Sequence, residues 1–254
     1  LKISKNMADF TKQFNKENTV AREIELINKS LKDIKDKETI IITKKAEKKP
    51  VLTIAVPAYN VEKYIEKCLF SIINGYNAEK MEVLVINDGS TDNTAEIVKK
   101  YEKLSNGIVR LINKENGGHG STINRAIQEA KGEYFRLIDG DDWVDSTNLS
   151  RLIDILENEK SDIVLTKGSY DYIEEAKLVD IIKYDNLVEG HQYNFEDLTY
   201  ENYGFKTYGP LLTTGNYRTE ILKKANFKIS EKKPYVDMEF NAFSLKYANT
   251  IIYY

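Results

Sequence analysis

Cysteine is nearly absent from this chain of 254 residues, because Cys68 is the only one. An internal disulfide needs two cysteines, so a disulfide framework is excluded and the composition fits a reducing compartment. Cys68 stands among the apolar residues Ile65, Leu69 and Ile72 at helical spacing. We therefore expect a buried thiol within a helix.

Long hydrophobic runs are also missing. No segment approaches the ~18 apolar residues of a membrane-spanning helix, and residues 1 to 4 do not begin a hydrophobic signal segment. The lack of an initial methionine suggests a fragment. We expect a cytoplasmic protein without a transmembrane span, and peripheral association with the inner face of the plasma membrane stays open.

An excess of basic residues is missing as well. The 37 Lys and Arg residues stand against 40 Asp and Glu, which leaves a net charge of -3. Binding to a nucleic acid needs a basic surface, so we expect no nucleic-acid partner. The hydrophobic share of 41% suffices for one sizeable domain with an extension.

Glycine and proline do not occur in residues 1–49. Apolar residues recur there at spacings of four and three: Val20, Ile24, Ile27, Leu31 and Ile34. This pattern predicts an amphipathic helix, so we interpret 1–49 as an N-terminal helical extension with a linker. The helix packs on its own domain in the simpler interpretation, and it joins the subunits of a homo-oligomer in the other.

From Pro50 onward, predicted strands alternate with predicted helices. The apolar runs predict strands at 51–56, 82–87, 108–112 and 134–138, and helical spacing predicts helices at 61–73, 94–104 and 121–130. We expect Pro57 to end the first strand. Such βα steps predict an α/β domain over 50–254, with a parallel sheet covered by helices and a ligand beyond the carboxyl ends of its strands.

An acidic turn follows the fourth strand. Asp139, Asp141 and Asp142 repel one another unless a cation or hydrogen bonds compensate, and Mg²⁺ accepts such oxygen ligands while it bridges to phosphate. Gly140 permits the turn. Taken alone, the residues fit a metal-diphosphate site and an ordinary acidic turn before a helix equally well.

The half from 146 to 254 is less regular. We expect helices at 149–158, 220–224 and 235–247, strands at 163–166 and 249–254, and either separate strands or a hairpin within 170–184. The last helix begins with two acidic residues, Asp237 and Glu239. As residues at a helix start, they could simply favour the helix dipole.

Four motifs stand at the expected strand ends: Val56-Pro-Ala-Tyr-Asn60, Asn87-Asp-Gly-Ser-Thr-Asp92, Asn116-Gly-Gly-His-Gly120 and Asp139-Gly-Asp-Asp142. In order and spacing they resemble the bacterial type of family 2 glycosyltransferases with a GT-A fold. The resemblance covers about residues 51 to 254. It implies a Rossmann-like, mostly parallel sheet with helices on both faces, a nucleotide-binding half at 50–145 and an acceptor half at 146–254 that continues past Tyr254 in relatives.

The resemblance also implies roles for residues. Asp141 would bind Mg²⁺ or Mn²⁺, and Asp237 would be the catalytic base. Asp88 would accept from the uracil or ribose. For His119 the resemblance gives no role: by its place in Asn116-Gly-Gly-His-Gly120 it either touches a phosphate or is a loop side chain in solvent. The residues expected to bind the nucleotide-sugar are Pro57, Ala58, Tyr59, Asn60, Asp88, Gly89, Asn116, Gly117, Gly118, His119, Asp139 and Gly140.

The implied activity is transfer of a sugar from a nucleoside-diphosphate sugar, with UDP expected, and inversion at the anomeric carbon. The acceptor would be a glycan, a lipid-linked glycan or another hydroxyl compound in polysaccharide or cell-surface glycan synthesis. Two departures from the family are Val236, where an acid is common, and Ile123, where an Arg is common. The alternatives are a nucleotide-sugar-binding scaffold without turnover, or a nucleotidyltransferase.

Overall fold

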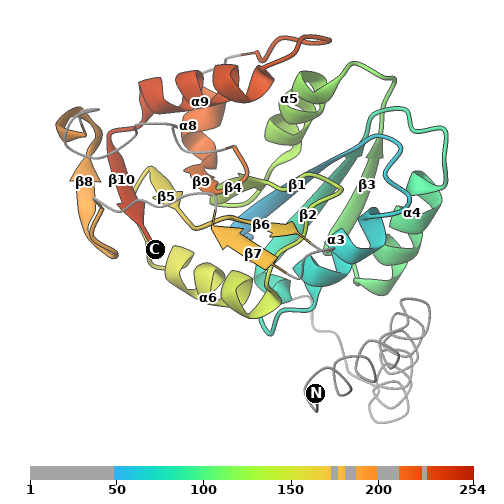
Figure 1. Ribbon diagram of the computed structural model, residues 1–254, viewed down its shortest axis with the longest axis horizontal. Helices are drawn as coiled ribbons and strands as arrows, with labels where there is room; N and C mark the ends of the chain where they lie inside the picture. The colour runs from blue at the N-terminus through green and yellow to red at the C-terminus, as the bar shows by residue number, and fades with distance from the viewer. Residues whose placement is uncertain (1–48, 173–176, 181–186, 199–211, 225–227) are drawn as a thin grey trace, which may run out of the picture. The chain divides into compact units, whose positions relative to one another are not determined.

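The computed structural model describes residues 49–172, 177–180, 187–198, 212–224 and 228–254. Except for Lys49, the predicted N-terminal extension lies outside these residues. The main sheet has eight strands in the order β3-β2-β1-β4-β9-β5-β10-β8. Figure 1 shows how the helices flank this sheet.

The first half of the domain consists of βα steps, as the sequence predicts. Strands β1 (Leu52–Ala58), β2 (Met81–Asn87), β3 (Val109–Asn113) and β4 (Tyr134–Leu137) pair in parallel. The elements between them are α3 (Ile65–Ile73), the short η1 (Ala78–Lys80), α4 (Thr94–Leu104) and α5 (His119–Glu129). Helix α3 begins four residues later than expected, and α5 begins two residues earlier.

The expected end of the first strand at Pro57 is wrong, because β1 continues through it to Ala58. Ala55 and Pro57 direct their carbonyl groups to the β4 side, where they accept from the N–H groups of Ile138 at 3.0 Å and Gly140 at 3.1 Å. Strand β4 itself has ended at Leu137. Proline lacks an N–H, and here the loss falls where no strand residue needs that donor.

The second half changes strand direction. Strand β9 (Gly215–Arg218) lies antiparallel between β4 and β5 (Ile163–Leu165). Strand β10 (Thr250–Tyr253) pairs in parallel with β5 and antiparallel with β8 (Gln192–Asn194). The remaining elements are α6 (Ser146–Leu156), the hairpin of β6 (Ser169–Tyr172) and β7 (Lys177–Asp180), η2 (Phe195–Asp197), α8 (Thr219–Lys224) and α9 (Val236–Tyr247). Most strand pairs in the described sheet are parallel, which confirms the α/β prediction.

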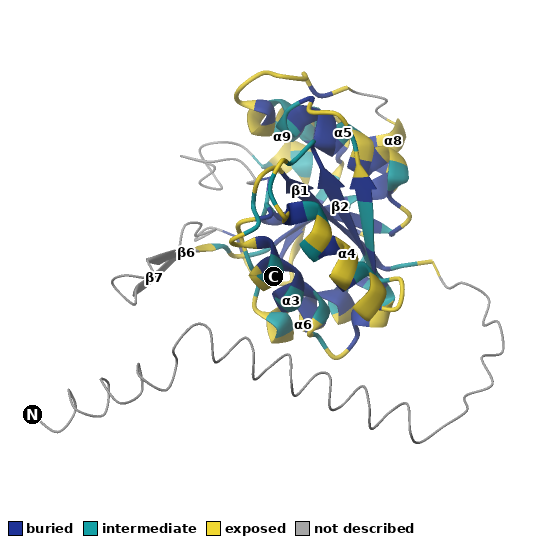
Figure 2. Ribbon diagram, turned by 90° about the vertical axis from the view of Figure 1, so that its right-hand side faces the viewer, coloured by how far each residue is buried: buried dark blue, intermediate teal, exposed yellow. Residues whose placement is uncertain are grey.

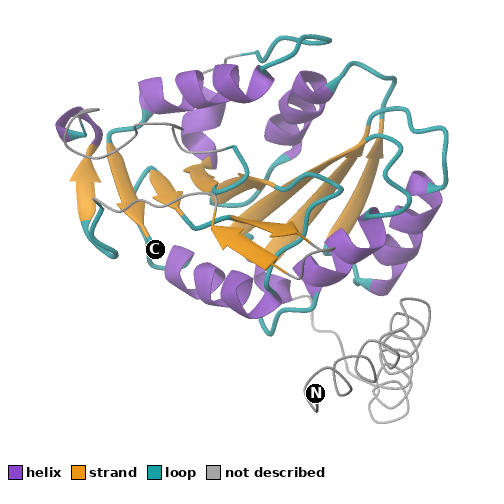
Figure 3. Cartoon of the chain, in the orientation of Figure 1, coloured by secondary structure: helices purple, strands orange, loops and turns teal. Residues whose placement is uncertain are grey.

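Helices cover both faces of the sheet (Figures 1 and 3). Helices α3, α4 and α6 lie on one face, and α5, α8 and α9 lie on the other. Along β2, Val83 and Val85 pack into the core on the face covered by α3, α4 and α6. Leu84 and Ile86 pack into the core on the opposite face, under α5, α8 and α9. Figure 2 shows the sheet buried between the two helical layers. A parallel strand with both faces buried reads as a continuous apolar run, which explains why 82–87 lacks alternation.

Two further expectations concern burial and membranes. Cys68 lies in α3 and is fully buried, as predicted. Among the described residues, no helix has the length and hydropathy that a bilayer crossing requires.

Candidate active site

The acidic turn leaves β4 beside the carboxyl end of β1. The Gly140 N–H donates to the Pro57 carbonyl, and a Cβ at Gly140 would lie 2.9 Å from that same oxygen. Gly140 is not among the glycines with positive φ. Close approach of two backbones, rather than a left-handed turn, therefore requires glycine here. Trp143 anchors the end of the turn to α3, since the Lys67 Nζ lies 3.0 Å from its ring centroid.

Burial and neighbouring negative charges raise the pKa values of two residues in the acidic turn, Asp139 and Asp142. Burial raises the pKa of Asp139; the charge of His119 opposes this, whereas Asp141 and Asp237 add to it. Burial, followed by the charges of Asp139 and Asp141, raises the pKa of Asp142 to about 6. A bound cation would relieve this repulsion, so the residues present fit a hard divalent metal.

The loop after β1 begins with two exposed residues, Tyr59 and Asn60. Pro57 and Ala58 are buried, whereas Tyr59 is 52% exposed. Asn60 has φ 53° and ties this loop to the next one, because its Oδ1 accepts from the Thr91 N–H at 2.8 Å. The exposed Tyr59 ring is available to a nucleobase, which agrees with its predicted role without testing it.

Asp88 holds the backbone of the loop Asn116-Gly-Gly-His-Gly120, here called the glycine loop, from the inside. Its carboxylate is buried and accepts from the Gly117 N–H at 3.0 Å and the Gly118 N–H at 2.8 Å. The Lys114 Nζ donates to it at 2.6 Å, and the Ser121 hydroxyl lies at 3.4 Å. The sequence predicted a contact between Asp88 and the nucleotide. The structure shows a scaffold role, and the nucleotide contact stays a prediction.

Backbone conformation or close packing explains three glycines in the loops that follow β2 and β3. Gly89 and Gly118 have φ values of 75° and 81°, in the left-handed region that favours glycine. At Gly117 a Cβ would lie 2.6 Å from the Ser121 Oγ. Asn116 is exposed at the start of this loop. His119, the first residue of α5, directs its Nε2 to within 3.9 Å of the Asp139 Oδ1.

The segment 228–235 connects the glycine loop to α9. The Lys232 N–H donates to the Gly117 carbonyl at 3.0 Å, and a Cβ at Gly120 would collide with the Ser230 carbonyl oxygen. The Asn124 side chain bonds both backbone groups of Ile229. These contacts fix the start of α9 against the start of α5.

One cavity of about 390 Å³ lies at this junction. It brings together His119, Asp139 and Asp237, which come from α5, the acidic turn and the first turn of α9. Its other lining residues are Leu212, Thr213, Lys233, Pro234, Tyr235 and Val236. Three residues singled out from distant parts of the sequence thus share one cavity, and their roles stay predictions.

The two acidic residues in the first turn of α9 differ in their hydrogen-bond partners. Glu239 accepts from the Ser230 N–H at 2.9 Å and from its hydroxyl at 3.2 Å. Asp237 is exposed and lines the cavity. Within the described residues, no hydrogen bond or ion pair engages Asp237. It is therefore the carboxylate that remains available to a substrate.

Sequence reasoning missed the 228–235 segment as part of the site. Lys233, Pro234 and Tyr235 line the cavity, but no periodic pattern marks them. The left-handed φ of 60° at Tyr235 has no signal in residue type either, because tyrosine is uncommon there.

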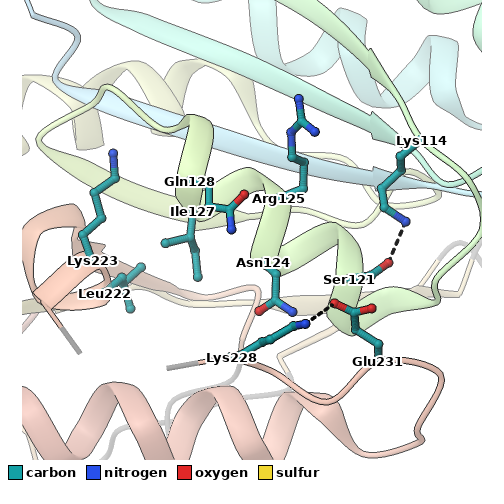
Figure 4. A pocket seen from close by; sticks show the side chains of 10 residues that line it. All are labelled: Lys114, Ser121, Asn124, Arg125, Ile127, Gln128, Leu222, Lys223, Lys228 and Glu231. Carbon is teal, nitrogen blue, oxygen red and sulfur yellow. Dashed lines mark hydrogen bonds and ion pairs between the residues drawn. The ribbon is translucent and has the colours of Figure 1, made fainter. Parts of the chain in front are cut away.

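A second cavity of about 580 Å³ lies on the outer side of α5 (Figure 4). Basic side chains gather around it: Lys114, Arg125, Lys223 and Lys228. Several of them already bind protein groups, since Lys114 pairs with Asp88, Arg125 with Glu129 and Lys228 with Glu231. Neither the predicted base Asp237 nor the predicted metal ligand Asp141 borders this cavity, whereas Asp237 lines the smaller one, so the smaller cavity is the candidate site.

The described residues hold no group of three or more His, Cys, Asp or Glu side chains arranged to bind a metal ion. A site built on Asp141 would therefore complete its coordination with phosphate oxygens and water, as Mg²⁺ commonly does. Asp141 is exposed in the turn, so its oxygens are open to such a ligand.

Comparison with known proteins shows the family to which this domain belongs. The model of glycosyl transferase family 2 matches residues 53–220. The chain belongs to this family. The match includes the first three motifs and the acidic turn, and it ends before α9.

Two curated relatives and one solved structure show the extent of the similarity. The chain is 38% identical to the uncharacterized glycosyltransferase EpsJ of Bacillus subtilis over 115 residues, which is 45% of this chain and 33% of EpsJ. It is 30% identical to the glycosyltransferase GlyA of Streptococcus pneumoniae over 186 residues, which is 71% of this chain and 26% of GlyA. It thus spans a third or less of these relatives.

The crystal structure of Staphylococcus aureus TarS 1-349 in complex with UDP superposes with a TM-score of 0.66 at 26% identity, over 80% of this chain and 57% of TarS. A complex of the same fragment with UDP-GlcNAc gives 0.61 at 29% identity, over 80% of this chain and 55% of that one. These matches confirm the GT-A fold.

Proposed function

We propose that the chain transfers a sugar from a UDP-sugar to a hydroxyl group of a glycan or lipid-linked acceptor, with inversion at the anomeric carbon. The observation that carries this proposal is the cavity that Asp139 and Asp237 line together, within a domain of glycosyl transferase family 2. One carboxylate belongs to the acidic turn and the other starts α9, so a donor and an acceptor can meet between them.

The donor lies across the carboxyl ends of β1, β2 and β4. Its nucleobase packs near the exposed Tyr59, and its diphosphate lies by Gly118 and the acidic turn. The backbone at Gly118 is held by Asp88, so this surface exists before the donor arrives. Pre-organised contacts lower the cost of binding. TarS, which has this fold, is known in complex with UDP and with UDP-GlcNAc, and this supports uridine as the nucleoside.

In this proposal Asp141 would hold Mg²⁺ or Mn²⁺. Such a metal would supply positive charge against the departing diphosphate. Asp139 and Asp142 lie beside Asp141, and their raised pKa values reflect burial and the negative charges of neighbouring carboxylates. Asp139 in turn orients the donor sugar or ribose near His119.

Asp237 accepts the proton of the acceptor hydroxyl. The acceptor oxygen attacks the anomeric carbon as the bond from that carbon to the diphosphate oxygen breaks, and the electron pair of that bond leaves with UDP. A single displacement of this kind inverts the anomeric configuration. Glu239 is the competing base, but its oxygens already accept two hydrogen bonds from Ser230.

The variant Asp237→Asn tests the base. Shape is nearly preserved while proton acceptance is lost, so transfer should fall by the ~10²–10⁴-fold that general-base catalysis supplies. The affinity for UDP, measured by calorimetry with Mn²⁺, should stay unchanged. Transfer is followed as UDP release from UDP-GlcNAc with a panel of oligosaccharide acceptors, and Glu220→Gln, an exposed acid on α8, is the matched control.

Two outcomes would contradict the proposal. Unchanged transfer by Asp237→Asn would move the base elsewhere. Equal UDP affinity in Mn²⁺ and in EDTA would remove the metal from Asp141, and the variant Asp141→Asn should reproduce the EDTA result.

A further inference from the structure

The 228–235 segment contains two strained residues. Lys232 has φ 55° and Tyr235 has φ 60° with ψ 30°. The other non-glycine residues with positive φ in the described chain are asparagines, Asn60 and Asn106, which tolerate this region. In a tyrosine the Cβ crowds the following carbonyl. Tyr235 is also the N-cap of α9 and makes no side-chain capping bond, although asparagine or serine would serve better there.

Contacts on both sides hold this strain. Before Tyr235, the Lys232 N–H is fixed to the Gly117 carbonyl at 3.0 Å. Around it, Glu239 holds the Ser230 backbone and hydroxyl. Strain that the surrounding structure enforces clusters at functional sites. The question is therefore what the unusual conformation displays.

It displays an apolar platform at the cavity. Tyr235 lines the cavity that holds Asp139 and Asp237, yet 76% of Tyr235 is exposed. Met238, in the first turn of α9, is 67% exposed. A large aromatic ring and a thioether thus flank Asp237 in sequence, although asparagine at position 235 would relieve the backbone strain and remove the exposed ring.

We propose that Tyr235, together with Met238, binds the acceptor sugar. The Tyr235 ring packs against the C–H face of a pyranose, and this contact holds the reacting hydroxyl against the Asp237 carboxylate. Aromatic rings bury large apolar area at a low cost in side-chain entropy. Met238 adapts to the shape of the neighbouring residue of the acceptor chain. The inference rests on the proposed function, because it places the acceptor beside the proposed base.

The test compares Tyr235→Asn with Tyr235→Phe. Binding of cellobiose, lactose and chitobiose is measured by saturation-transfer NMR with saturating UDP and Mn²⁺. The wild-type protein should transfer saturation to the pyranose C–H groups of at least one saccharide. Tyr235→Phe should keep that affinity because the ring remains, and Tyr235→Asn should weaken it about tenfold. The control is Tyr247→Asn, which changes an exposed tyrosine at the other end of α9.

Stability and donor binding separate the possible failures. The melting temperature of Tyr235→Asn should not fall, because asparagine tolerates the left-handed region. Unchanged saccharide affinity in Tyr235→Asn, or no saturation transfer to any of the three saccharides in the wild-type protein, would overturn the inference. An equal loss in Tyr235→Phe would overturn stacking. A wild-type protein that does not bind UDP would instead overturn the proposed function.

Discussion

Replacing Asp88 by Asn would show whether this carboxylate is a scaffold or a nucleotide ligand. The change keeps the shape but turns one oxygen into a donor. That donor would then face the Gly117 N–H and the Lys114 ammonium, or the Gly118 N–H, all of which are donors themselves. The Lys114 charge, only 20% exposed, would lose its carboxylate.

The magnitude follows from these contacts. Removing one partner of a buried ion pair costs about 3–5 kcal/mol, out of a total stability of about 5–15 kcal/mol for a typical domain. At about 2–4 °C per kcal/mol for a domain of this size, the melting temperature should fall by roughly 10 °C. Urea unfolding followed by circular dichroism measures the change, and Asp197→Asn, at an exposed carboxylate of η2, is the control.

Calorimetry with UDP on the folded variant completes the experiment. If Asp88 is chiefly a scaffold, stability falls and the affinity for UDP falls only through the loosened glycine loop. A variant with wild-type stability that no longer binds UDP would refute the scaffold reasoning. It would return Asp88 to the nucleotide contact that the sequence motif implies.

Three further predictions follow from other contacts. Gly120→Ala should lose about 1–3 kcal/mol of stability through overpacking against the Ser230 carbonyl, and a gain of stability in urea unfolding, as helix propensity alone predicts, would contradict the close contact. The folded-state pKa of Asp142 is about 6, above its unfolded value of about 3.9, so ionisation of Asp142 disfavours folding as the pH rises between these values. Asp142→Asn should therefore gain stability relative to the wild type from pH 4 to pH 7. A stability difference between variant and wild type that does not change with pH would refute this. Arg136 is buried, and burial lowers its pKa to about 10. Within the described residues its Nε has no hydrogen-bond partner and no carboxylate pairs with it. Arg136→Met should therefore be neutral or more stable by about 1–4 kcal/mol in urea unfolding, whereas a loss of several kcal/mol would reveal an acidic partner.

Local patterns explain how much of the fold was predictable. The βα steps from β1 to β4 carry apolar runs and helical spacings that act over a few residues, so their elements were found within a few residues of their ends. The position of β9 was not predictable in this way. Residue types indicate a strand and a turn around Gly209 to Tyr217, but they do not show that β9 lies antiparallel between β4 and β5.

In the candidate site, too, the residues marked by local motifs could be predicted, whereas the contacts between distant segments could not. His119, Asp139 and Asp237 were singled out by motif, and the structure brings them to one cavity. The direction of the Asp88 carboxylate depends on Lys114 and on two backbone N–H groups 29 and 30 residues away. No local pattern encodes such long-range pairing, and the same holds for the contact between Gly120 and Ser230.

The place of β10 in the sheet has a consequence for biosynthesis. This strand lies between β5 and β8, both of which precede it by more than fifty residues. During translation, the pairs of β1 with β2, β2 with β3 and β1 with β4 can all form once Leu137 has emerged, long before β10 is made. The edge strand β8 cannot join the sheet until the ribosome has released Tyr253. Until then, β5 exposes an unpaired edge, and such edges invite association with other chains.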